Sequence, residues 1–238
     1  MKRIFFAATA LFAVLFASCD KETETINPMP PTTAVGAQVT ISLSGADPDT
    51  RAFFDTTAKA EAWESSLSTL SVFAFDNNGA LIIRRDFTPA ELASKSATFA
   101  LPKSTAGTEC SFYAVANYDA SSAKTRAALT ALVENSVAAY NGTFAEVSTA
   151  AKRSGGFVMS GFTTKTVGTV NTTTNIGITL KRTVAKIAFQ ATVDPSFVDK
   201  YPGSLTVNSV KLSKAASQSL VVAGTPTPGA MSYTHTQT

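Results

Sequence analysis

The sequence predicts an all-β protein with short helical insertions, and three observations support this fold class. Residues 39–44 alternate strictly between apolar and polar side chains, which is the period of a half-buried strand. From about residue 67 onward, short runs rich in apolar and aromatic residues follow one another between turn signals. Ala, Ser, Thr and Val are abundant, and charged residues make up only 16% of the chain, which fits an exported β-rich protein.

The amino terminus predicts a cleaved lipoprotein signal. Two basic residues precede an apolar run over 4–17, which is too short to span a bilayer stably. Small residues then lie directly before Cys19, the arrangement that a lipoprotein signal peptidase requires. We therefore expect residues 1–18 to be the signal peptide and Cys19 to be the lipid attachment site. The alternative is an ordinary signal peptide with an incidental cysteine.

Residues 20–37 are polar and rich in proline, so they predict an extended tether without a core. The strand over 39–44 follows and places three apolar side chains on one face: Val39, Ile41 and Leu43. A turn-forming run over 45–49 ends this strand and places Arg51 in an exposed polar loop, where proteases cut readily.

The remaining helices and strands are predicted from the spacing of apolar residues and from the residues that form turns or cap helices. Asp76–Gly79 predicts a hairpin turn. Capping boxes at Thr88–Glu91 and Thr143–Glu146 predict short helices to about residues 94 and 152. The spacing of Leu129, Leu132, Val133 and Val137 predicts a helix over 122–137 that covers a sheet edge. Strands are expected over 70–75, 80–84, 97–101, 110–117, 156–162, 174–181 and 184–193.

Asp194 and Pro195 mark a boundary, after which runs over 205–212 and 220–222 predict the start of another β unit. A polar tail follows. A second domain that begins near residue 200 has no room to finish, so we expect either a truncated chain, which we favour, or a single domain with an appendage. The Lys181–Arg182 pair is expected to be solvated charge at a strand end.

The charge balance excludes some classes of protein. Removing residues 1–18 takes away Lys2 and Arg3 and no acid, so 18 basic residues face 17 acidic ones and the net charge is +1. The mature chain therefore has no large excess of positive charge that would favour binding to nucleic acid or to an anionic membrane surface. If Cys19 carries lipid, Cys110 is the only thiol, no internal disulfide can form, and we expect Cys110 to be buried and inert.

The sequence argues against an enzyme, a metal site or a cofactor. The single histidine, His235, lies in the polar tail, so none is left for a core catalytic triad or a histidine-based zinc site. The chain contains no nucleophile elbow, zinc-protease, P-loop or dinucleotide fingerprint. Asp47 and Asp49 could be offered as a calcium pair, but two acids beside a proline are more often a loop.

Several runs together resemble the fimbrillin family of Bacteroidales pili, the major fimbrial subunit type. The runs are the signal ending at Cys19, the strand 39–43 followed by 50–53, and segments 70–75, 112–117, 156–161 and 180–189. The resemblance implies two transthyretin-like β-sandwich domains, export as a lipoprotein and trimming after an arginine by a surface protease. It carries over Cys19 for lipid and Arg51, before Ala52, for cleavage. The chain has no match for the rest of the family's second domain.

These expectations combine into one organisation. Residues 1–18 are the signal peptide, 19–51 a propeptide with tether and removable strand, 52–198 an amino-terminal β-sandwich, and 199–238 a partial second β domain. After cleavage the removable strand leaves an apolar groove and an unpaired sheet edge, which another subunit's strand can fill. The expected partners are other fimbrial subunits, an arginine-specific surface protease and, through acyl chains before cleavage, the outer membrane. The expected final location is a cell-surface fimbria.

Two other functions stay open. A surface lipoprotein could bind a ligand such as a glycan and never polymerise, in which case it would keep residues 19–51, and the 39–44 strand would be an edge strand that stays in place. An anchoring or accessory fimbrial subunit could also escape trimming. Sugar-binding faces usually need several exposed aromatic residues, whereas Trp63 is the only tryptophan and most of the 16 Phe lie in strand-like runs. We therefore expect those Phe residues in a core.

Overall fold

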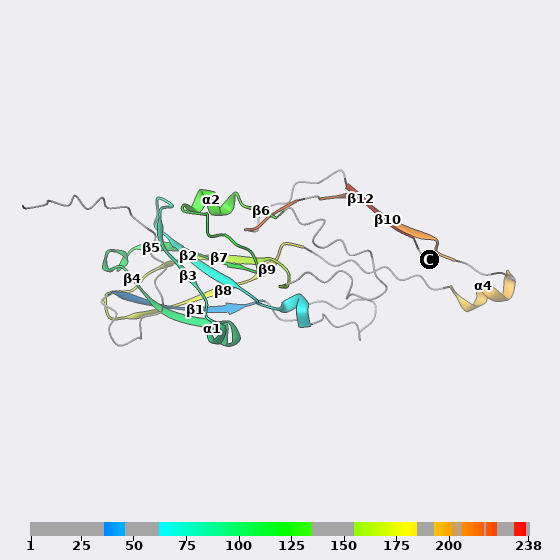
Figure 1. Cartoon of the computed structure of the whole chain (residues 1–238). Helices are drawn as coiled ribbons and strands as arrows, with labels where there is room; N and C mark the ends of the chain where they lie inside the picture. Colours follow the sequence, from blue (N-terminus) through cyan, green and yellow to red (C-terminus); the bar gives the residue numbers. More distant parts are fainter. Residues whose placement is uncertain are drawn as a thin grey trace, which may run out of the picture.

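The computed structural model shows a mostly β protein with short helices (Figure 1). It describes residues 36–45, 62–134, 155–184, 193–222 without 202, 204, 205 and 217, and 231–236. The expected capping box at 143–146 and almost all of the expected strand over 184–193 lie outside these described residues.

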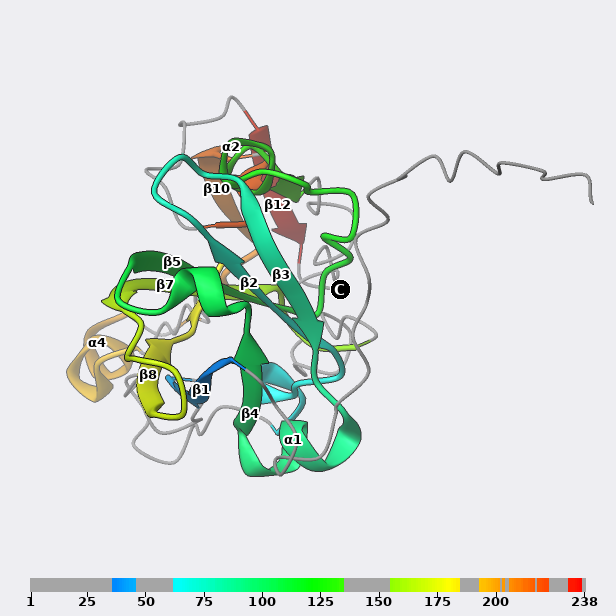
Figure 2. The same cartoon turned by 90° about the vertical axis from the view of Figure 1, so that its left-hand side faces the viewer.

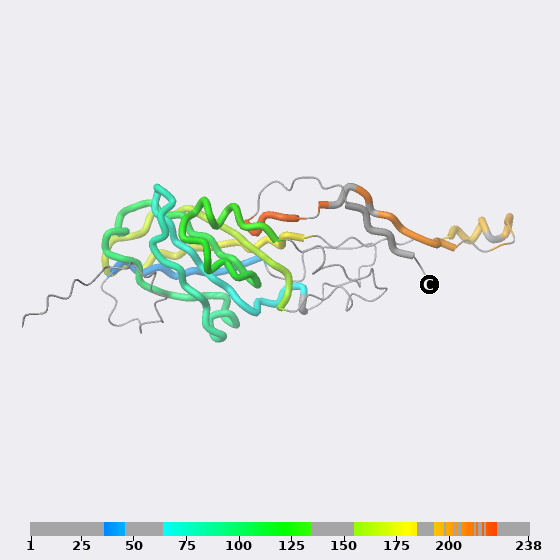
Figure 3. The backbone as a smooth tube through the Cα atoms, turned by 45° about the horizontal axis from the view of Figure 1, so that its top comes forward, coloured from blue at the N-terminus to red at the C-terminus, as the bar shows by residue number. Residues whose placement is uncertain are grey.

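A three-stranded sheet contains the strand expected over 39–44. Its order is β4-β1-β8, with β1 at Ala37–Ser44, β4 at Ser96–Leu101 and β8 at Thr173–Thr179. β1 pairs antiparallel with β4 and parallel with β8. Figure 3 shows β1 in blue running beside β8 in yellow, although the two are far apart in sequence. The idea that 39–44 is an edge strand is therefore wrong, because both of its sides are paired.

The second sheet has five strands in the order β3-β2-β5-β7-β9, and every neighbouring pair is antiparallel. Its strands are β2 at Leu70–Phe75, β3 at Leu81–Asp86, β5 at Glu109–Ala116, β7 at Met159–Thr166 and β9 at Lys181–Arg182. All six residues of β2 are buried. Successive side chains of a strand point to opposite faces of the sheet. A strand whose residues are all buried must therefore be covered on both faces of its sheet.

The inner face of this sheet packs against the three-stranded sheet. One core cluster draws Val39 and Ile41 from β1, Ile176 from β8, and Val72 and Phe112 from the five-stranded sheet. Figure 2 shows β8, β1 and β4 in that order below the five-stranded sheet. The shared cluster makes the two sheets the layers of a sandwich. Cys110 also lies in this cluster, so its expected burial is confirmed.

The outer face of the five-stranded sheet is covered by a second cluster. Phe73, Phe75 and Tyr113 of the sheet pack there with Leu129 of α2, which spans Arg126–Thr130. Val221 and Val222 are buried in the same cluster, next to β11 at Ser219–Leu220, which pairs with β6 at Val133–Glu134. Figure 1 shows α2 on the side of the sheet opposite to β1 and β8.

Two sequence expectations need correction here. In the described part of the segment expected as a helix, residues 122–134, only the five residues of α2 are helical; Val133 enters β6 instead, because pairing with β11 competes with helix propagation. The segment does reach a sheet edge, since Thr125 bridges Ala80 beside β3, and Leu129 packs on the sheet's outer face. Arg182 is not simple solvated charge, since it is half-buried and its Nε donates to the Glu64 carbonyl at 3.0 Å.

The carboxyl-terminal residues form β10 at Ser209–Ala215 and β12 at Met231–Thr236, which pair antiparallel. The expectation of a polar tail is therefore wrong for 231–236, where His235 is opposite Val210 in the register. α4 at Pro195–Lys200 precedes them, and Asp194 caps it by accepting from the Ser196 amide. The described residues also form two 3-10 turns, η2 at Ala62–Ser65 and η3 at Lys103–Thr105.

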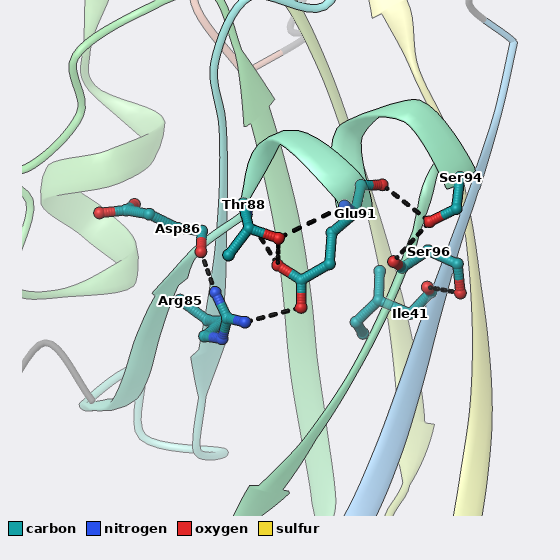
Figure 4. Close-up of polar contacts among 7 residues, drawn as sticks. All are labelled: Ile41, Arg85, Asp86, Thr88, Glu91, Ser94 and Ser96. Carbon is teal, nitrogen blue, oxygen red and sulfur yellow. Dashed lines mark hydrogen bonds and ion pairs between the residues drawn. The ribbon is translucent and has the colours of Figure 1, made fainter. Parts of the chain in front are cut away.

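The crossover between the sheets is built on the expected capping box. α1 spans Pro89–Ser94, and the Thr88 hydroxyl accepts from the Glu91 amide while the Glu91 carboxylate accepts from the Thr88 amide at 2.7 Å. Glu91 also pairs with Nη2 of Arg85 at 2.7 Å (Figure 4). Arg85 lies opposite Val72 in the register and its side chain is 4% exposed, so this pair neutralises a buried charge at the end of the core.

Glu91→Ala is expected to destabilise the chain by about 3–5 kcal/mol, because it leaves the buried Arg85 guanidinium without its carboxylate. Thr88→Ala is the matched control, since it removes the cap and leaves the ion pair; its cost is about 1 kcal/mol. Urea unfolding of the two variants measures the difference. Equal destabilisation would mean that only the cap matters.

Candidate functional site

The candidate site is the slot that β1 occupies between β4 and β8. Main-chain hydrogen bonds tie β1 to its surroundings at both ends. Near the start, the Gln38 amide donates to the Thr172 carbonyl at 3.1 Å. Near the end, the Leu43 amide donates to the Lys95 carbonyl at 2.9 Å, and the Leu180 amide donates to the Ser44 carbonyl at 2.8 Å. A strand held on both sides completes the sheet rather than extending it.

The inner face of β1 contributes to the core at every second residue. Ala37, Val39 and Ile41 are completely buried, and Leu43 is 9% exposed. This is the alternation that the sequence predicts for 39–44, extended by two residues at its start. Because the side-chain period of a strand is two, these four residues occupy the same face and fill one continuous groove.

The outer face of β1 carries small polar side chains. The Thr40 and Thr98 hydroxyls are 2.9 Å apart, and those of Ser44 and Thr179 are 3.1 Å apart, so β1 is linked to both neighbours. The Ser96 hydroxyl also donates to the Ile41 carbonyl at 3.1 Å (Figure 4). Exposed hydroxyl pairs contribute little free energy, so the apolar inner face sets which strand fits the slot.

The other expected site residues are Cys19, Arg51 and Ala52, and they lie outside the described residues. The structure therefore brings together the three residues of the expected removable strand, Val39, Ile41 and Leu43, in one buried row.

A polar anchor holds the chain that follows the expected cleavage point. Asn117 has φ of 58° and its side chain makes four hydrogen bonds. Its Oδ1 accepts from the Ser68 and Thr69 amides at 2.8 and 3.3 Å, and its Nδ2 donates to the Ser66 and Phe157 carbonyls at 2.7 and 2.8 Å. None of these partners belongs to β1, so the anchor does not depend on that strand.

Asn117→Ala is expected to destabilise the chain by about 2–4 kcal/mol, because it removes four hydrogen bonds and leaves their partners unpaired. Asn171→Ala is the matched control. Asn171 also has a left-handed φ, 67°, but makes no side-chain hydrogen bond within the described part of the chain. Thermal unfolding compares the two. If Asn117→Ala lowers stability no more than Asn171→Ala does, the left-handed backbone conformation alone would explain the effect of the substitution at Asn117.

The chemistry of the described residues offers little to catalysis. Burial raises the pKa of the Cys110 thiol, which keeps it protonated and unreactive. Among the described residues, no three His, Cys, Asp or Glu side chains gather in a way that could hold a metal ion. Within the same part of the chain, no helix is long and apolar enough to cross a membrane.

Sequence reasoning missed the walls of the slot and the anchor. β4 and β8 were expected as strands, but nothing in their residues said that β1 lies between them. The alternation of Ile176, Ile178 and Leu180 is a signal for a one-sided strand like β1 and could have suggested a shared face. The sequence predicts Asn117 as the last residue of the strand over 110–117, whereas β5 ends at Ala116 and Asn117 has a left-handed φ.

A family model matches most of this chain. The family is described as major fimbrial subunit protein (FimA), and the match covers residues 37–218, which begins at the first residue of β1. Among curated proteins, none is significantly similar in sequence to the chain.

Three solved structures are similar to the chain to different degrees. A fimbrial assembly protein from Parabacteroides distasonis is 14% identical, with a TM-score of 0.50, over 84% of this chain and 77% of that one. A candidate cell adhesion protein from Bacteroides eggerthii is 21% identical, with a TM-score of 0.40, over 66% and 42%. The tip fimbrial protein Mfa3 from Porphyromonas gingivalis, with C-terminal truncation, is 14% identical, with a TM-score of 0.38, over 62% and 48%. The chain spans less than half the length of the last two.

Proposed function

The chain belongs to the FimA major fimbrial subunit family, and from this premise we propose that it polymerises by donor-strand exchange after cleavage behind Arg51. Members of this family are structural subunits of cell-surface fimbriae and not enzymes, so the expected partners include other fimbrial subunits. The polymerisation step, the cleavage and the lipid stage are our proposal for this chain.

The observation that carries the proposal is the position of β1. Burial of Val39, Ile41 and Leu43 contributes about 1.5–3 kcal/mol each, or roughly 5–9 kcal/mol together. A whole domain is stable by only about 5–15 kcal/mol. A chain that lost β1 would therefore be under strong thermodynamic pressure to acquire a replacement strand.

The central position of β1 strengthens this argument. Removal of an edge strand would expose one new edge, but removal of β1 exposes the facing edges of both β4 and β8. Unpaired edges are templates for strands of other chains. When each subunit inserts a strand into the slot of the next, the contact repeats head to tail along the assembly. Such a contact produces an open filament.

We propose that the precursor reaches this state as a lipoprotein. Residues 1–18 are removed, Cys19 is acylated and holds the precursor at the outer membrane, and an arginine-specific surface protease then cuts between Arg51 and Ala52. The cut releases β1 together with the lipid-bearing tether, since both precede it in the chain. Cleavage would thus open the slot and free the subunit for the fimbria at the same time.

We also propose the domain organisation and the finer fold class. Residues 52–198 form a transthyretin-like sandwich, which the two facing sheets support. Residues 199–238 are part of a second β domain, which the separate pairing of β10 with β12 supports. Residues 219–222 connect the two, since β11 pairs with β6 and Val221 and Val222 pack on the sandwich.

Intact mass and N-terminal sequence of protein sheared from the cell surface test the proposal. A chain that starts at Ala52, without lipid, in high-mass assemblies is the expected result. A chain that starts at acylated Cys19 and stays monomeric in membranes would contradict it. That second result would favour a ligand-binding surface lipoprotein or an anchoring subunit that is never trimmed.

A further inference from the structure

We propose that the β1 slot accepts a replacement strand in a single register, because main-chain carbonyls close it at both ends. This inference rests on the proposed strand exchange and names what the slot selects. Two glycines, Gly36 and Gly45, flank the eight residues of β1. The space around each shows why the strand is bounded there.

At the start of the slot, the Leu101 carbonyl blocks any side chain. A Cβ added to Gly36 would lie 2.1 Å from the Leu101 oxygen, a separation that Cβ atoms essentially never show. Leu101 is the last residue of β4 and pairs with Ala37 in the register. The obstacle is main chain of a paired neighbouring strand, so it cannot rotate away as the end of a flexible side chain could.

At the other end, the Leu180 carbonyl has the same role. A Cβ on Gly45 would lie 2.5 Å from the Leu180 oxygen and 2.8 Å from Cγ2 of Thr179. Gly45 also has φ of +86°, which residues with a side chain rarely adopt. The Leu180 amide donates to the Ser44 carbonyl, so Leu180 lies directly against the end of the strand in the slot.

Between the two walls the inner positions differ in size. Ala37 is completely buried beside the first wall, and the larger Val39, Ile41 and Leu43 follow. A strand that slid by two residues would keep its apolar side inward but would place the residue equivalent to Gln38 or Leu43 against a carbonyl. A slide by one residue would turn its apolar side outward.

The partner that fits is therefore an extended segment of another fimbrial subunit with a defined pattern. It has no side chain at the positions of Gly36 and Gly45, a small residue at that of Ala37, and larger apolar residues at those of Val39, Ile41 and Leu43. Every subunit would then be joined to the next with the same offset, which a regular filament needs.

Glycine-to-alanine variants of the full chain test the walls. Gly36→Ala and Gly45→Ala should each lower the Tm. Gly177→Ala is the matched control, since Gly177 lies in β8 opposite Ser42 and a Cβ there would meet nothing within 4 Å. It should leave the Tm unchanged or raise it slightly. Losses at Gly36 and Gly45 no larger than that at Gly177 would overturn the inference.

Peptide capture tests the selection. The full chain is cleaved after Arg51 in the presence of a labelled decapeptide with the sequence of residues 36–45, or the same peptide with both end glycines replaced by alanine. We expect capture of the first and at least about tenfold weaker capture of the second. Equal capture would sink the single register and leave strand exchange standing. Capture of neither peptide after complete cleavage would sink strand exchange, and this inference with it.

Discussion

A chain carrying Arg51→Ala is expected to accumulate as the full-length precursor and to form no high-mass assemblies. Without the cut, β1 stays covalently joined to the domain whose slot it fills. An intramolecular strand competes at a high effective concentration, about millimolar for a short flexible connection, so a strand from another subunit cannot displace it. The expected loss of polymer is therefore nearly complete rather than partial.

Size-exclusion chromatography and intact mass of the purified variant measure this result. Thr50→Ala changes the neighbouring residue and should assemble like the unmodified chain. Arg51→Lys distinguishes a protease that cleaves only after arginine from one that also cleaves after lysine. Only the second kind of protease would allow this variant to assemble. Polymers of Arg51→Ala protein that retain residues 19–51 would refute cleavage-activated exchange.

Ile41→Asp is expected to prevent stable folding of the precursor. Ile41 is completely buried at the centre of β1, so the variant loses about 2–5 kcal/mol of packing and also buries a carboxylate without a partner, at a further cost of several kcal/mol. The sum is comparable with the total stability of a domain, about 5–15 kcal/mol.

Ser42→Asp is the matched control, since Ser42 is the next residue of the same strand and faces solvent. It should change stability by no more than about 0.5 kcal/mol. Circular dichroism during urea unfolding compares the variants, and Ile41→Ala gives a graded intermediate at about 2–5 kcal/mol. A folded Ile41→Asp chain of normal stability would mean that the sandwich does not depend on β1.

Local signals in the sequence predicted local structure well. The capping box at Thr88–Glu91 opens α1, and the turn at Asp76–Gly79 joins β2 to β3. The alternation of Val39, Ile41 and Leu43 is confirmed by their burial. In the first two cases the deciding contacts lie within a few residues of one another. In the third the pattern is local, but the side chains are buried against β8 and the five-stranded sheet.

The failures all involve a partner distant in sequence. The residues after α2 have helical spacing but enter β6, because β11 is available from about 85 residues further along. The segment expected as a polar tail becomes β12 because β10 can pair with it. The side chain of Asn117 is an anchor only because Ser66, Ser68 and Phe157 come together around it.

The amino-acid pattern was sufficient to predict a β-rich exported subunit and the row of side chains that its first strand buries, because alternation and signal features are encoded in neighbouring residues. It could not predict that β1 is central, that its removal would open two facing edges, or that the Leu101 and Leu180 carbonyls close the slot. Those features depend on pairing between strands that can be more than a hundred residues apart in the sequence. Which strands pair is determined when the two sheets pack on one core, and the residues of a single strand do not specify which strands lie beside it.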